Sequence, residues 1–289
     1  MSINRKYSKA VVLGAGGFIG INLVQRLVSE GYDVVCFARK VSPEWPESAS
    51  AITGDFADMP MELLNELDDA LVFHLISSCR PSSNTLKAVD EITGDIQSTV
   101  HYLEITKNRS LRWIFVSSGG TVYGHNENQS IDESSPLNPI CSYGIVKLTI
   151  ERYFSLYRSI HDTDYTVVRL ANPYGPWQSP VLGQGIVATM IYKALRGEPV
   201  EIWGDGGNTR DYIYISDAVV ALLAVANYGG VGEIYNAGTG LGTSLNELIA
   251  AVTQVLNVEM QVSYCKVRSV DVRRNVLAVD KINNMAYLE

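Results

Sequence analysis

The stretch "VVLGAGGFIG" at residues 11–20 decides the fold, because its glycines, at 14, 17 and 20 among others, separate a short apolar run from a helical pattern. Gly14 permits a tight turn, Gly17 lets the backbone approach a pyrophosphate, and Gly20 lets the helix pack closely on the strand. The beginning of the helix then offers N–H groups and the positive end of its dipole to phosphates. In this strand–turn–helix context the glycines predict a dinucleotide-binding turn, with a plain tight turn as the alternative.

Short apolar runs alternate with helical patterns around and beyond this turn. Five runs are typical of buried strands bounded by glycine or polar residues: "AVVLGAG", "DVVCFAR", "LVFHLIS", "RWIFVSS" and "YTVVRLA". A helical pattern, "FIGINLVQRLVSEGY", lies between the first two and ends at Gly31. Repeated strand–helix–strand units make right-handed crossovers, so the sequence predicts an α/β fold with a doubly wound parallel sheet that extends to about residue 171.

The character of the chain changes after this point. "NPYGPWQSPVLGQG" is typical of a loop, "IVATMIYKALRG" of a helix, and "SLNELIAAVTQVL" of a helix that Ser244 and Glu247 cap reciprocally. We therefore expect a smaller C-terminal region that covers the strand ends of the sheet. The expected division assigns 1–171 plus 211–238 to the sheet domain and 172–210 plus 239–289 to the smaller region.

Composition and charge argue against several classes of function. Of the 289 residues, 46% are hydrophobic and 19% are charged, which is typical of a globular protein. The net charge of −8 and the lack of a basic tract argue against nucleic acid or an anionic membrane as a partner. No apolar run reaches the roughly 20 residues that span a bilayer, and the N-terminus has no signal-peptide pattern.

The spacing of cysteine and histidine indicates a reduced protein without a metal. The four cysteines show no C-x-x-C spacing, which favours free thiols in a cytoplasmic protein. The four histidines are scattered and lack the rhythm of metal ligands, so we expect no metal site.

The second predicted strand, "DVVCFARK", departs from the usual dinucleotide-binding pattern at its end. An acidic residue there normally holds the adenosine ribose hydroxyls, but this strand ends in Ala38-Arg39. The Arg39 guanidinium could receive a 2′-phosphate, which favours NADP; alternatively it stacks on adenine or points to solvent. Asp55, after the next predicted strand, could accept a hydrogen bond from the adenine amine or be a solvated turn residue.

Several motifs in a characteristic order make the chain resemble a known family. They are "GAGGFIG", "VFHL", "SSGGTVYG", "SYGIVK", "RLANPYGP", "IWGDGGNTRDYIYISD" and "YNAGTG", the first beginning at residue 14 and the last including residue 238. On these motifs the chain resembles the extended short-chain dehydrogenase/reductase family, and within it the nucleotide-sugar epimerases of the UDP-glucose 4-epimerase type. The resemblance implies a Rossmann fold, nicotinamide chemistry and a smaller nucleotide-sugar-binding region.

The motif "SYGIVK" carries the implied chemistry. Tyr143 and Lys147 are four residues apart and therefore share one face of a helix. In the resembled mechanism Tyr143 removes a proton from a sugar hydroxyl while hydride passes from C4 to the cofactor. Lys147 favours the phenolate, since the ordinary pKa of tyrosine is near ~10, and also holds the nicotinamide ribose. An exposed pair on an amphipathic helix is the alternative.

The resemblance also implies the surroundings of the cofactor. The cofactor is NAD, with NADP as the alternative that Ala38-Arg39 raises, and the resembled enzymes hold it tightly and regenerate it in each cycle. The implied cofactor-binding residues are Gly14, Gly17, Phe18, Ile19, Gly20, Arg39, Asp55, Phe56, Leu75, Ser117, Tyr143 and Lys147.

A third catalytic group is implied at the end of the fourth long strand, where the family places a serine or threonine. In "SSGGTVYG", aligned through "TVYG", that position falls on Gly119, which has no hydroxyl. The candidates to replace it are Ser118 and Thr121, with Ser117 third; ordinary hydrogen bonding at the strand end is their alternative role. A second departure is Asp95, where the family often has asparagine, and the sequence offers no account of it.

Cations and amide donors are expected around the two phosphates of a UDP-sugar. By resemblance, Asn172 and Arg210 face the diphosphate, and Arg268 joins them from the C-terminal region. Each arginine could instead form a structural or surface ion pair. Trp203 lies where the uracil or its ribose would pass, although a packing role is equally compatible with the sequence.

The leading hypothesis from the resemblance is a UDP-hexose 4-epimerase that acts through bound NAD. The second is an NADPH-dependent nucleotide keto-sugar reductase, supported by Ala38-Arg39, and the third is a silent dinucleotide-sensing or scaffold protein on the same fold. A dehydratase is disfavoured because Gly119 and Gly120 stand where its acidic pair would be. The sequence does not identify the hexose.

Association into a homodimer is also expected. Ile150, Phe154 and Tyr157 follow Tyr143 at helical spacing, and the resembled enzymes dimerise through two such helices as a four-helix bundle. Packing of these side chains inside the chain is the alternative. Members of the family usually continue with a further helical segment, which predicts that this chain is shortened at its C-terminus.

Overall fold

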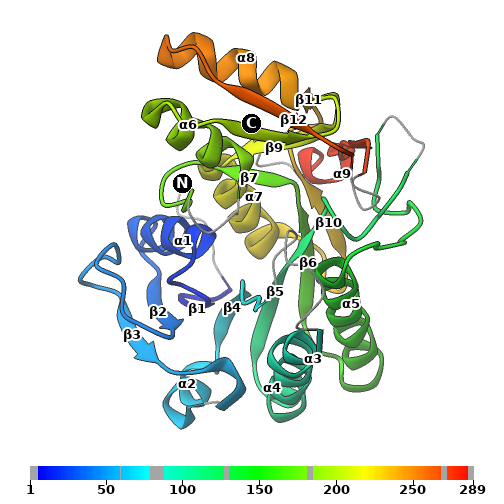
Figure 1. The fold of residues 1–289 in the computed structure, drawn as a ribbon. Coiled ribbons are helices and arrows are strands. Elements are labelled where there is room, and N and C mark those ends of the chain that lie inside the picture. Colours follow the sequence, from blue (N-terminus) through cyan, green and yellow to red (C-terminus); the bar gives the residue numbers. More distant parts are fainter. Residues whose placement is uncertain are drawn as a thin grey trace.

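The computed structural model describes residues 6–58, 60–78, 88–126, 130–180, 185–267 and 272–285. Within them, parallel strands form one large sheet of order β10-β6-β5-β4-β1-β2-β3 (Figure 1). The strands are β1 (Lys9–Leu13), β2 (Asp33–Ala38), β3 (Ser50–Thr53), β4 (Ala70–His74), β5 (Leu111–Ser118), β6 (Tyr165–Leu170) and β10 (Ile234–Ala237). Because β1 and β4 are neighbours although β2 and β3 come between them in the sequence, the strand order reverses there. The predicted doubly wound parallel sheet is confirmed.

Helices cover both faces of the large sheet, because the side chains of a buried strand point alternately to one face and the other. They are α1 (Phe18–Ser29), the 3₁₀ turn η1 (Phe56–Asp58), α2 (Met61–Glu66), α3 (Ala88–Glu91), the π-helical turn η2 (Ile92–Gln97), α4 (Ser98–Thr106), α5 (Ser142–His161) and α7 (Ile215–Tyr228). One face carries α1 and α7 over Val12 and Ile114. The opposite face carries α2, α4 and α5 over Val11 and Phe115.

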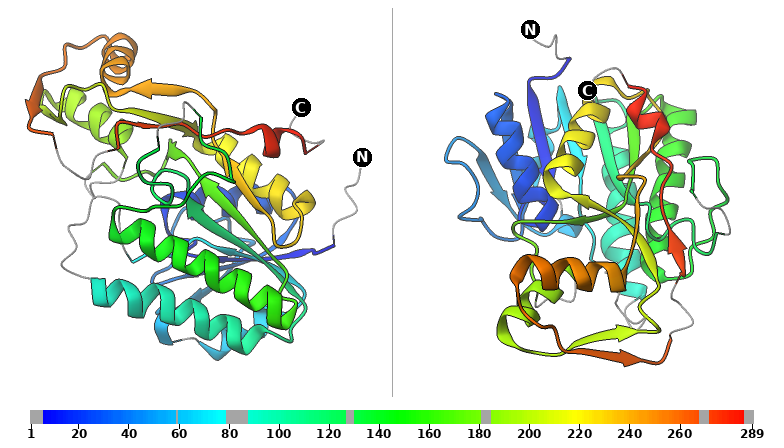
Figure 2. Two further views of the ribbon diagram at one scale, coloured as in Figure 1. Left: turned by 90° about the vertical axis from the view of Figure 1, so that its right-hand side faces the viewer. Right: turned by 90° about the horizontal axis from the view of Figure 1, so that it is seen from above.

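A smaller part of the chain lies beyond the carboxyl ends of the large sheet (Figures 1 and 2). Its first strand begins at residue 172, directly after the end of β6 at residue 170. Its elements are β7 (Asn172–Tyr174), α6 (Ile186–Arg196), β8 (Val200–Trp203), β9 (Thr209–Tyr214), β11 (Gly242–Ser244), α8 (Leu245–Leu256), β12 (Val262–Cys265) and β13 (Arg274–Asn275). One sheet has the order β11-β9-β13, with β7 also paired to β9, and β8 pairs with β12. α6 and α8 pack together and share a small apolar core with β8 and β12.

Two helices of the smaller part follow the sequence pattern closely. α6 ends at Arg196, and Gly197 follows it in the left-handed conformation with φ 65°, as expected of a glycine after a helix. α8 begins with the predicted capping box: the Ser244 hydroxyl accepts the N–H of Glu247, and the Glu247 carboxylate accepts the N–H of Ser244. The segment expected to be a loop differs at its beginning, because residues 172–174 pair with β9 as strand β7.

Residues 272–285 return to the large sheet. α9 (Asp280–Asn283) packs against β10, and Leu277 and Ile282 belong to the same apolar core as α1 and α7. The predicted division of the chain into two regions stays a prediction, and the last described segment contributes to the larger core.

Three general features of the described residues bear on function. They contain no helix long and apolar enough to cross a membrane. Within the same residues, no group of three or more His, Cys, Asp or Glu side chains is placed to hold a metal ion. The cysteines in this part of the chain, Cys36, Cys141 and Cys265, are free thiols.

Candidate active site

The glycine turn between β1 and α1 has the geometry that its residues require. Gly14 lies at φ 90°, a conformation that favours glycine, and its N–H donates to the Phe37 carbonyl of β2 at 2.9 Å. A Cβ at Gly20 would be 2.3 Å from the Gly14 carbonyl oxygen, so only glycine lets α1 approach the turn this closely. A Cβ at Gly17 would meet only that same oxygen, at 3.4 Å, which leaves open space beside the turn.

The first turn of α1 suits the diphosphate of a dinucleotide. Gly17 is the N-cap, and among the described residues no side chain caps this helix and no acidic residue lies in its first turn. The first backbone N–H groups, from Phe18 and Ile19 onward, therefore keep their capacity to bind an anion, and the helix dipole favours negative charge there.

Trp45 supports the turn from outside the motif. Its indole N–H donates to the Ala15 carbonyl at 3.0 Å, and its ring is buried in the apolar core with residues of α1. No sequence signal identifies this residue, because it lies in an irregular segment after β2, far from the turn that it contacts.

The end of β2 offers no carboxylate to an adenosine ribose. A Cβ at Gly16 would be 3.3 Å from the Cβ of Ala38, so these two small residues lie against each other, and Arg39 is exposed. Asp55 is exposed as well, and one of its carboxylate oxygens accepts the N–H of Ala57 at 2.9 Å. The exposure of Arg39 is compatible with binding a 2′-phosphate, with stacking on adenine and with pointing to solvent. The exposure of Asp55 is compatible with accepting from the adenine amine and with a solvated turn.

Two further residues predicted to contact the cofactor differ in their placement. The Phe56 side chain is buried and stacks on Tyr102, with 4.6 Å between ring centroids, so it belongs to the core. Leu75 continues β4 beside the glycine turn: its N–H donates to the Leu13 carbonyl at 2.9 Å, and its carbonyl carbon would be 3.2 Å from a Cβ at Gly14. The Leu75 side chain is partly buried and packs against the apolar core that α1 and α7 share.

Tyr143 and Lys147 lie in the first two turns of α5 beside the ends of β4 and β5. Lys147 is 2% exposed, and its ammonium donates to the carbonyls of Val116 at 3.1 Å and Ile76 at 3.4 Å. The same nitrogen is 5.8 Å from the ring centroid of Tyr143, which is partly exposed. The two residues are therefore not a surface pair, because a buried ammonium adjoins an accessible phenol at the carboxyl edge of the sheet.

Asp95 holds the segment that follows β4. Its carboxylate oxygens accept the N–H of Ser78 at 2.8 and 3.0 Å and the hydroxyl of Ser77 at 3.2 Å. An ionised carboxylate only accepts hydrogen bonds, which matches these donors. The structure thus accounts for an aspartate at a position that the sequence left unexplained.

His74 is a fully buried neutral group next to this site. Its Nε2 lies 2.8 Å from the Thr99 hydroxyl. Burial, and secondly the charge of Lys147, keep the pKa of His74 well below its ordinary value of 6.5. Lys147 therefore has an uncharged neighbour here.

The three candidate hydroxyls, two at the end of β5 and one just after it, have different surroundings. Ser117 is buried and donates to a carboxylate on α5. The Oγ1 atom of Thr121 is also buried, and within the described residues it has no hydrogen-bond partner. Ser118 is partly exposed, and a Cβ at Gly120 would be 3.8 Å from its Oγ and 3.6 Å from Oδ1 of Asn172. Ser118 is thus the hydroxyl that lies near both solvent and the Asn172 amide.

Gly119 lacks space for the side chain that the resembled family places there. A Cβ at this position would be 2.6 Å from Cδ1 of Leu277 and 3.1 Å from the carbonyl oxygen of Arg169. The side-chain amide of Asn275 donates to the Gly119 carbonyl at 3.0 Å. The last described segment of the chain therefore fills this space and holds the loop.

The predicted substrate residues are brought together in part. Asn172 in β7 and Arg210 in β9 lie on neighbouring strands, and the Asn172 amide donates to the Asp211 carbonyl at 2.9 Å. Arg210 is partly exposed and donates to a backbone carbonyl at 2.9 Å. Trp203 ends β8 in the separate strand pair, with 40% of its surface exposed. Arg268 lies outside the described residues.

Asp211, which lies in the motif "IWGDGGNTRDYIYISD", holds several backbone segments together, a role that the sequence does not indicate. It is fully buried; one carboxylate oxygen accepts the N–H and the hydroxyl of Thr239 at 2.9 and 2.7 Å, and the other accepts the N–H of Gly240 at 3.0 Å. The second oxygen also accepts the N–H of Leu277 at 3.4 Å. Asp211 therefore ties the loop after β10 to the last described segment.

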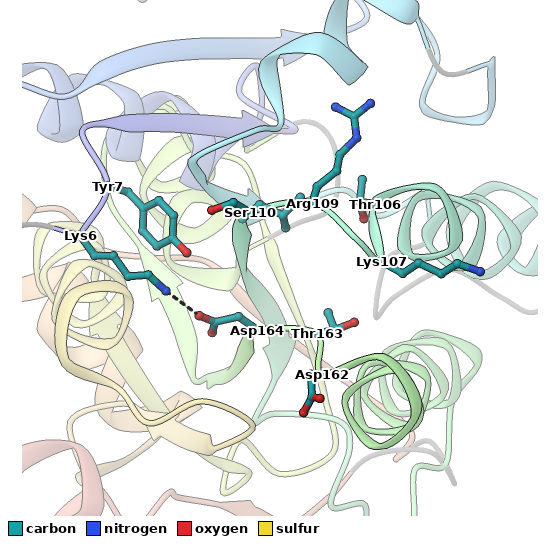
Figure 3. A pocket seen from close by; sticks show the side chains of 10 residues that line it. Lys6, Tyr7, Thr106, Lys107, Arg109, Ser110, Asp162, Thr163 and Asp164 are labelled. Carbon is teal, nitrogen blue, oxygen red and sulfur yellow. Dashed lines mark hydrogen bonds and ion pairs between the residues drawn. The ribbon is translucent and has the colours of Figure 1, made fainter.

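A cavity of about 190 Å³ lies at the opposite edge of the large sheet, before β5 and β6 (Figure 3). Lys6 and Asp164 in its lining form an ion pair at 3.4 Å, and Arg109 pairs with Asp68 at 2.9 Å. Ligands of doubly wound sheets bind beyond the carboxyl ends of the strands. This cavity, at the amino ends, is therefore not the candidate active site.

Known proteins match nearly the whole chain. Residues 10–238 match the NAD dependent epimerase/dehydratase family. The putative UDP-glucose 4-epimerase of Methanocaldococcus jannaschii is 30% identical over 286 residues, which cover 96% of this chain and 92% of that protein. The structure of UDP-glucose 4-epimerase from Thermotoga maritima with UDP-glucose has a TM-score of 0.88 at 32% identity and covers 94% of this chain and 90% of that one. The complex of Thermus thermophilus UDP-glucose 4-epimerase with NAD has a TM-score of 0.87 at 26% identity and covers 95% and 92%.

Proposed function

The chain belongs to the NAD dependent epimerase/dehydratase family, and we propose that within this family it is a UDP-hexose 4-epimerase. The observation that carries the proposal is the accessible Tyr143 phenol beside the buried ammonium of Lys147. The loop with Ser118 adjoins them, since a Cβ at Gly144 would be 2.9 Å from the Thr121 carbonyl oxygen. Similarity to UDP-glucose 4-epimerases over nearly the full chain supports the same reaction.

The residues at the carboxyl edge of β1 and β4 fit a nicotinamide dinucleotide. We assign the diphosphate to Gly17 and the first turn of α1, because this turn has open space and N–H groups for an anion. We assign the nicotinamide ribose to Lys147. When bound, NAD supplies a reversible acceptor for the hydride at C4 of the sugar.

The proton of the 4-hydroxyl is handled by this chain. Tyr143 is assigned as the general base that removes the proton and later returns it, a kind of assistance worth roughly 10²–10⁴-fold. The Lys147 ammonium favours the phenolate electrostatically. Ser118 is assigned as the hydroxyl that bridges the phenol and the sugar, in preference to Thr121, because the Thr121 Oγ1 atom is buried whereas Ser118 is partly exposed.

The nucleotide half of the substrate is assigned to the smaller part. Asn172 and Arg210 supply an amide and a guanidinium, the donors that phosphate oxygens require. Trp203, exposed at the end of β8, is assigned to stacking on the uracil. Arg268 stays a prediction from the resemblance.

Proton NMR of the purified protein with UDP-glucose and no added cofactor tests the proposal. We expect the anomeric signal of UDP-galactose to grow, since retained NAD completes the cycle without a second substrate. UDP-N-acetylglucosamine and UDP-glucuronate are tested in parallel as alternative hexoses. Absence of a 4-epimer from all three, in protein shown to contain NAD, would contradict the assignment.

An NADPH-dependent nucleotide keto-sugar reductase is the second candidate, and the exposed Arg39 at the end of β2 favours it. This function predicts that NADPH binds more tightly than NADH and that Arg39→Ala removes the preference. Isothermal titration with both nucleotides measures it, with Lys40→Ala as the control for an adjacent exposed cation. Equal or reversed affinities of the wild-type protein would exclude the reductase.

We also propose a homodimer through α5, but through a different face of this helix from the one that carries Ile150, Phe154 and Tyr157. Ile150, Phe154 and Tyr157 are buried against the large sheet, so they belong to the core of the chain. Other apolar side chains of α5 are exposed: Ile145, Leu156 and Ile160. Light scattering at micromolar concentration should give twice the 31.7 kDa mass of the chain. A monomer mass for the wild-type protein would refute the dimer.

A further inference from the structure

Behind the candidate site, a continuous set of buried polar side chains joins α5, β5, β6 and β10. Its members, here called the Glu151 network, are Ser117, Tyr123, Glu151, Arg169 and Asn236. Glu151 accepts hydrogen bonds from the Ser117 hydroxyl and from Arg169, whose Nη2 lies 2.7 Å from Oε2. Nη1 of Arg169 donates to the Tyr123 phenol at 2.9 Å, and the phenol donates to Oδ1 of Asn236 at 2.7 Å.

Two members of this network, Tyr123 and Arg169, keep their protonation near neutral pH. Burial raises the pKa of Tyr123 to about 12, so the phenol stays neutral and continues to donate. Burial by itself lowers the pKa of Arg169, but the contacts with Glu151 raise it above its ordinary value, so the guanidinium stays charged. Arg169 and Glu151 form an ion pair at 2.7 Å with both side chains buried inside the protein.

A buried ion pair of this kind is not an efficient source of stability. The desolvation of two charges offsets most of their attraction, and replacement of such a pair by apolar side chains of similar volume is often neutral or stabilising. Buried polar contacts do restrict geometry, because their hydrogen bonds are satisfied in few arrangements. The network therefore points to a role in positioning.

On α5, Glu151 follows Lys147 by one helical turn and Tyr143 by two, so all three share one face of the helix. Lys147 donates to the Val116 carbonyl of β5, and Glu151 accepts from Ser117, the next residue of that strand. Successive turns of α5 are thus bonded to successive residues of β5. A shift of the helix along the strand would break both contacts.

The same network holds the loop that carries the candidate hydroxyls. Ser118 directly follows Ser117, which lies opposite Arg169 in the pairing of β5 with β6. Arg169 then contacts Tyr123 at the far end of the loop, and its guanidinium carbon lies 5.0 Å from the centroid of that ring. Both ends of the loop are therefore connected to Glu151.

We propose that Glu151 is a positioning residue that sets the Tyr143 phenol against the Ser118 hydroxyl. It bonds α5 to β5 through Ser117, and it holds the loop through Arg169. Its carboxylate faces Ser117 and Arg169, and it acts on the reaction only through the groups that it places. The inference rests on the proposed function, in which Tyr143 and Ser118 act on one sugar hydroxyl.

Ser117→Ala tests the link to β5 with little disturbance, because it removes one hydroxyl and leaves the ion pair in place. We expect kcat to fall roughly 10-fold with KM within about 2-fold, since misplaced reacting groups impair chemistry more than binding. Thr106→Val is the matched control, because it removes another buried hydroxyl, bonded to the Tyr102 carbonyl at 2.7 Å, at the opposite edge of the sheet. It should leave both constants unchanged.

The double variant Glu151→Leu/Arg169→Met separates positioning from stability. We expect its melting temperature to equal or exceed that of the wild type, because both buried charges are removed together. Its kcat should fall roughly 100-fold, since the helix and the loop lose their common connection. Wild-type kcat in this variant, or in Ser117→Ala, would overturn the proposal.

A measurement that does not require turnover can test the positioning role even if the proposed epimerase function is wrong. 3-Fluorotyrosine in place of Tyr143 reports the surroundings of that ring by ¹⁹F NMR. We expect a shifted or broadened line after Ser117→Ala and an unchanged line after Thr106→Val. An unchanged line after Ser117→Ala would overturn the positioning role. A shifted line in a protein that epimerises no UDP-hexose would support the positioning role and contradict only the proposed function.

Discussion

The glycine turn between β1 and α1 and the loop of residues 117–124, which begins with the last two residues of β5, belong to one proposed site, but they are built differently. In the turn, Gly20 packs against Gly14, six positions away, and both must be glycine for reasons contained in the turn. In the loop, Gly119 is shaped by Leu277 and held by Asn275, which is 156 positions away. The need for glycine at position 20 thus arises within the motif, whereas the need for glycine at position 119 arises from a contact that only the folded chain provides.

Tyr143, whose neighbour Gly144 packs against the loop, should show the largest effect. Tyr143→Phe removes the proposed base, so turnover should fall by about 10³-fold or more, while the NAD content of the purified protein stays unchanged because the glycine turn is untouched. The NMR rate and the bound cofactor are measured together, with Tyr153→Phe on the same helix as the control. Turnover within about 10-fold of the wild type would remove Tyr143 from the mechanism.

In the glycine turn, a substitution at Gly20 should lower the stability of the protein, whereas a substitution at Gly17 should lower its affinity for NAD. Gly20→Ala should cost about 3 kcal/mol of unfolding free energy, because its Cβ would be 2.3 Å from the Gly14 carbonyl oxygen. Gly17→Ala should cost less than about 1 kcal/mol, because its Cβ has space, but it should weaken NAD binding. Urea unfolding and calorimetric titration with NAD measure the two effects. Equal stability losses in both variants would show that the turn is not built as described.

The loop should show which hydroxyl reacts. Ser118→Ala should lower kcat roughly 10- to 100-fold with little change in stability, because a hydroxyl at the reacting group is lost. Thr121→Val should leave kcat nearly unchanged, because its Oγ1 atom is buried and makes no hydrogen bond within the described residues. Steady-state kinetics on both variants decide the assignment, and the reverse order of effects would transfer the role to Thr121.

The long-range contact of the loop can be tested by a double-mutant cycle. Gly119→Ala should destabilise the wild-type protein by about 1–2 kcal/mol, because its Cβ would be 2.6 Å from Cδ1 of Leu277. In a Leu277→Ala background the same change should cost about 1 kcal/mol less. Gly120→Ala, which has space, is the control. Additive losses from urea unfolding would show that Gly119 and Leu277 do not share this space.

His74 should give the smallest effect, through pH. Its folded-state pKa lies well below 6.5, so below that pH the unfolded chain binds a proton that the native state does not. The contribution of His74 to the free energy of unfolding is therefore fully present above about pH 6.5. It decreases as the pH falls, by at most about 1.4 kcal/mol per pH unit. Urea unfolding of wild type and His74→Gln from pH 5 to 8 measures it, with the exposed His101→Gln as control. Identical slopes in all three proteins would contradict a neutral His74.

Local sequence predicts much of the site but not the direction of each side chain. Tyr143 and Lys147 share a helical face because four residues make about one turn, and this requires no knowledge of the fold. Ser117 and Phe56 stay predictions as cofactor contacts, but the sequence does not indicate that the Ser117 hydroxyl donates to Glu151 or that the Phe56 ring stacks on Tyr102. Which side of a strand or turn faces the core depends on the packing around it.

Local sequence also misses roles that depend on distant contacts. Trp45 and Glu151 lie outside the motifs and Asp211 lies inside one, but all three contact segments far away in the sequence. Ile150 and Phe154 are recognised by their helical spacing, which indicates an apolar stripe. The spacing does not tell whether the sheet or a second chain covers this stripe, and in the structure both residues are buried.

The sequence by itself determined the alternation of strands and helices, the glycine turn and the helical face that pairs Tyr143 with Lys147. These features depend on interactions within a few residues, so the local pattern carries them. Only the tertiary structure decided that Leu277 fills the space beside Gly119, that Ser118 lies near solvent and that Glu151 connects helix, strand and loop. These features depend on which distant segments meet, and close packing then leaves room for one arrangement.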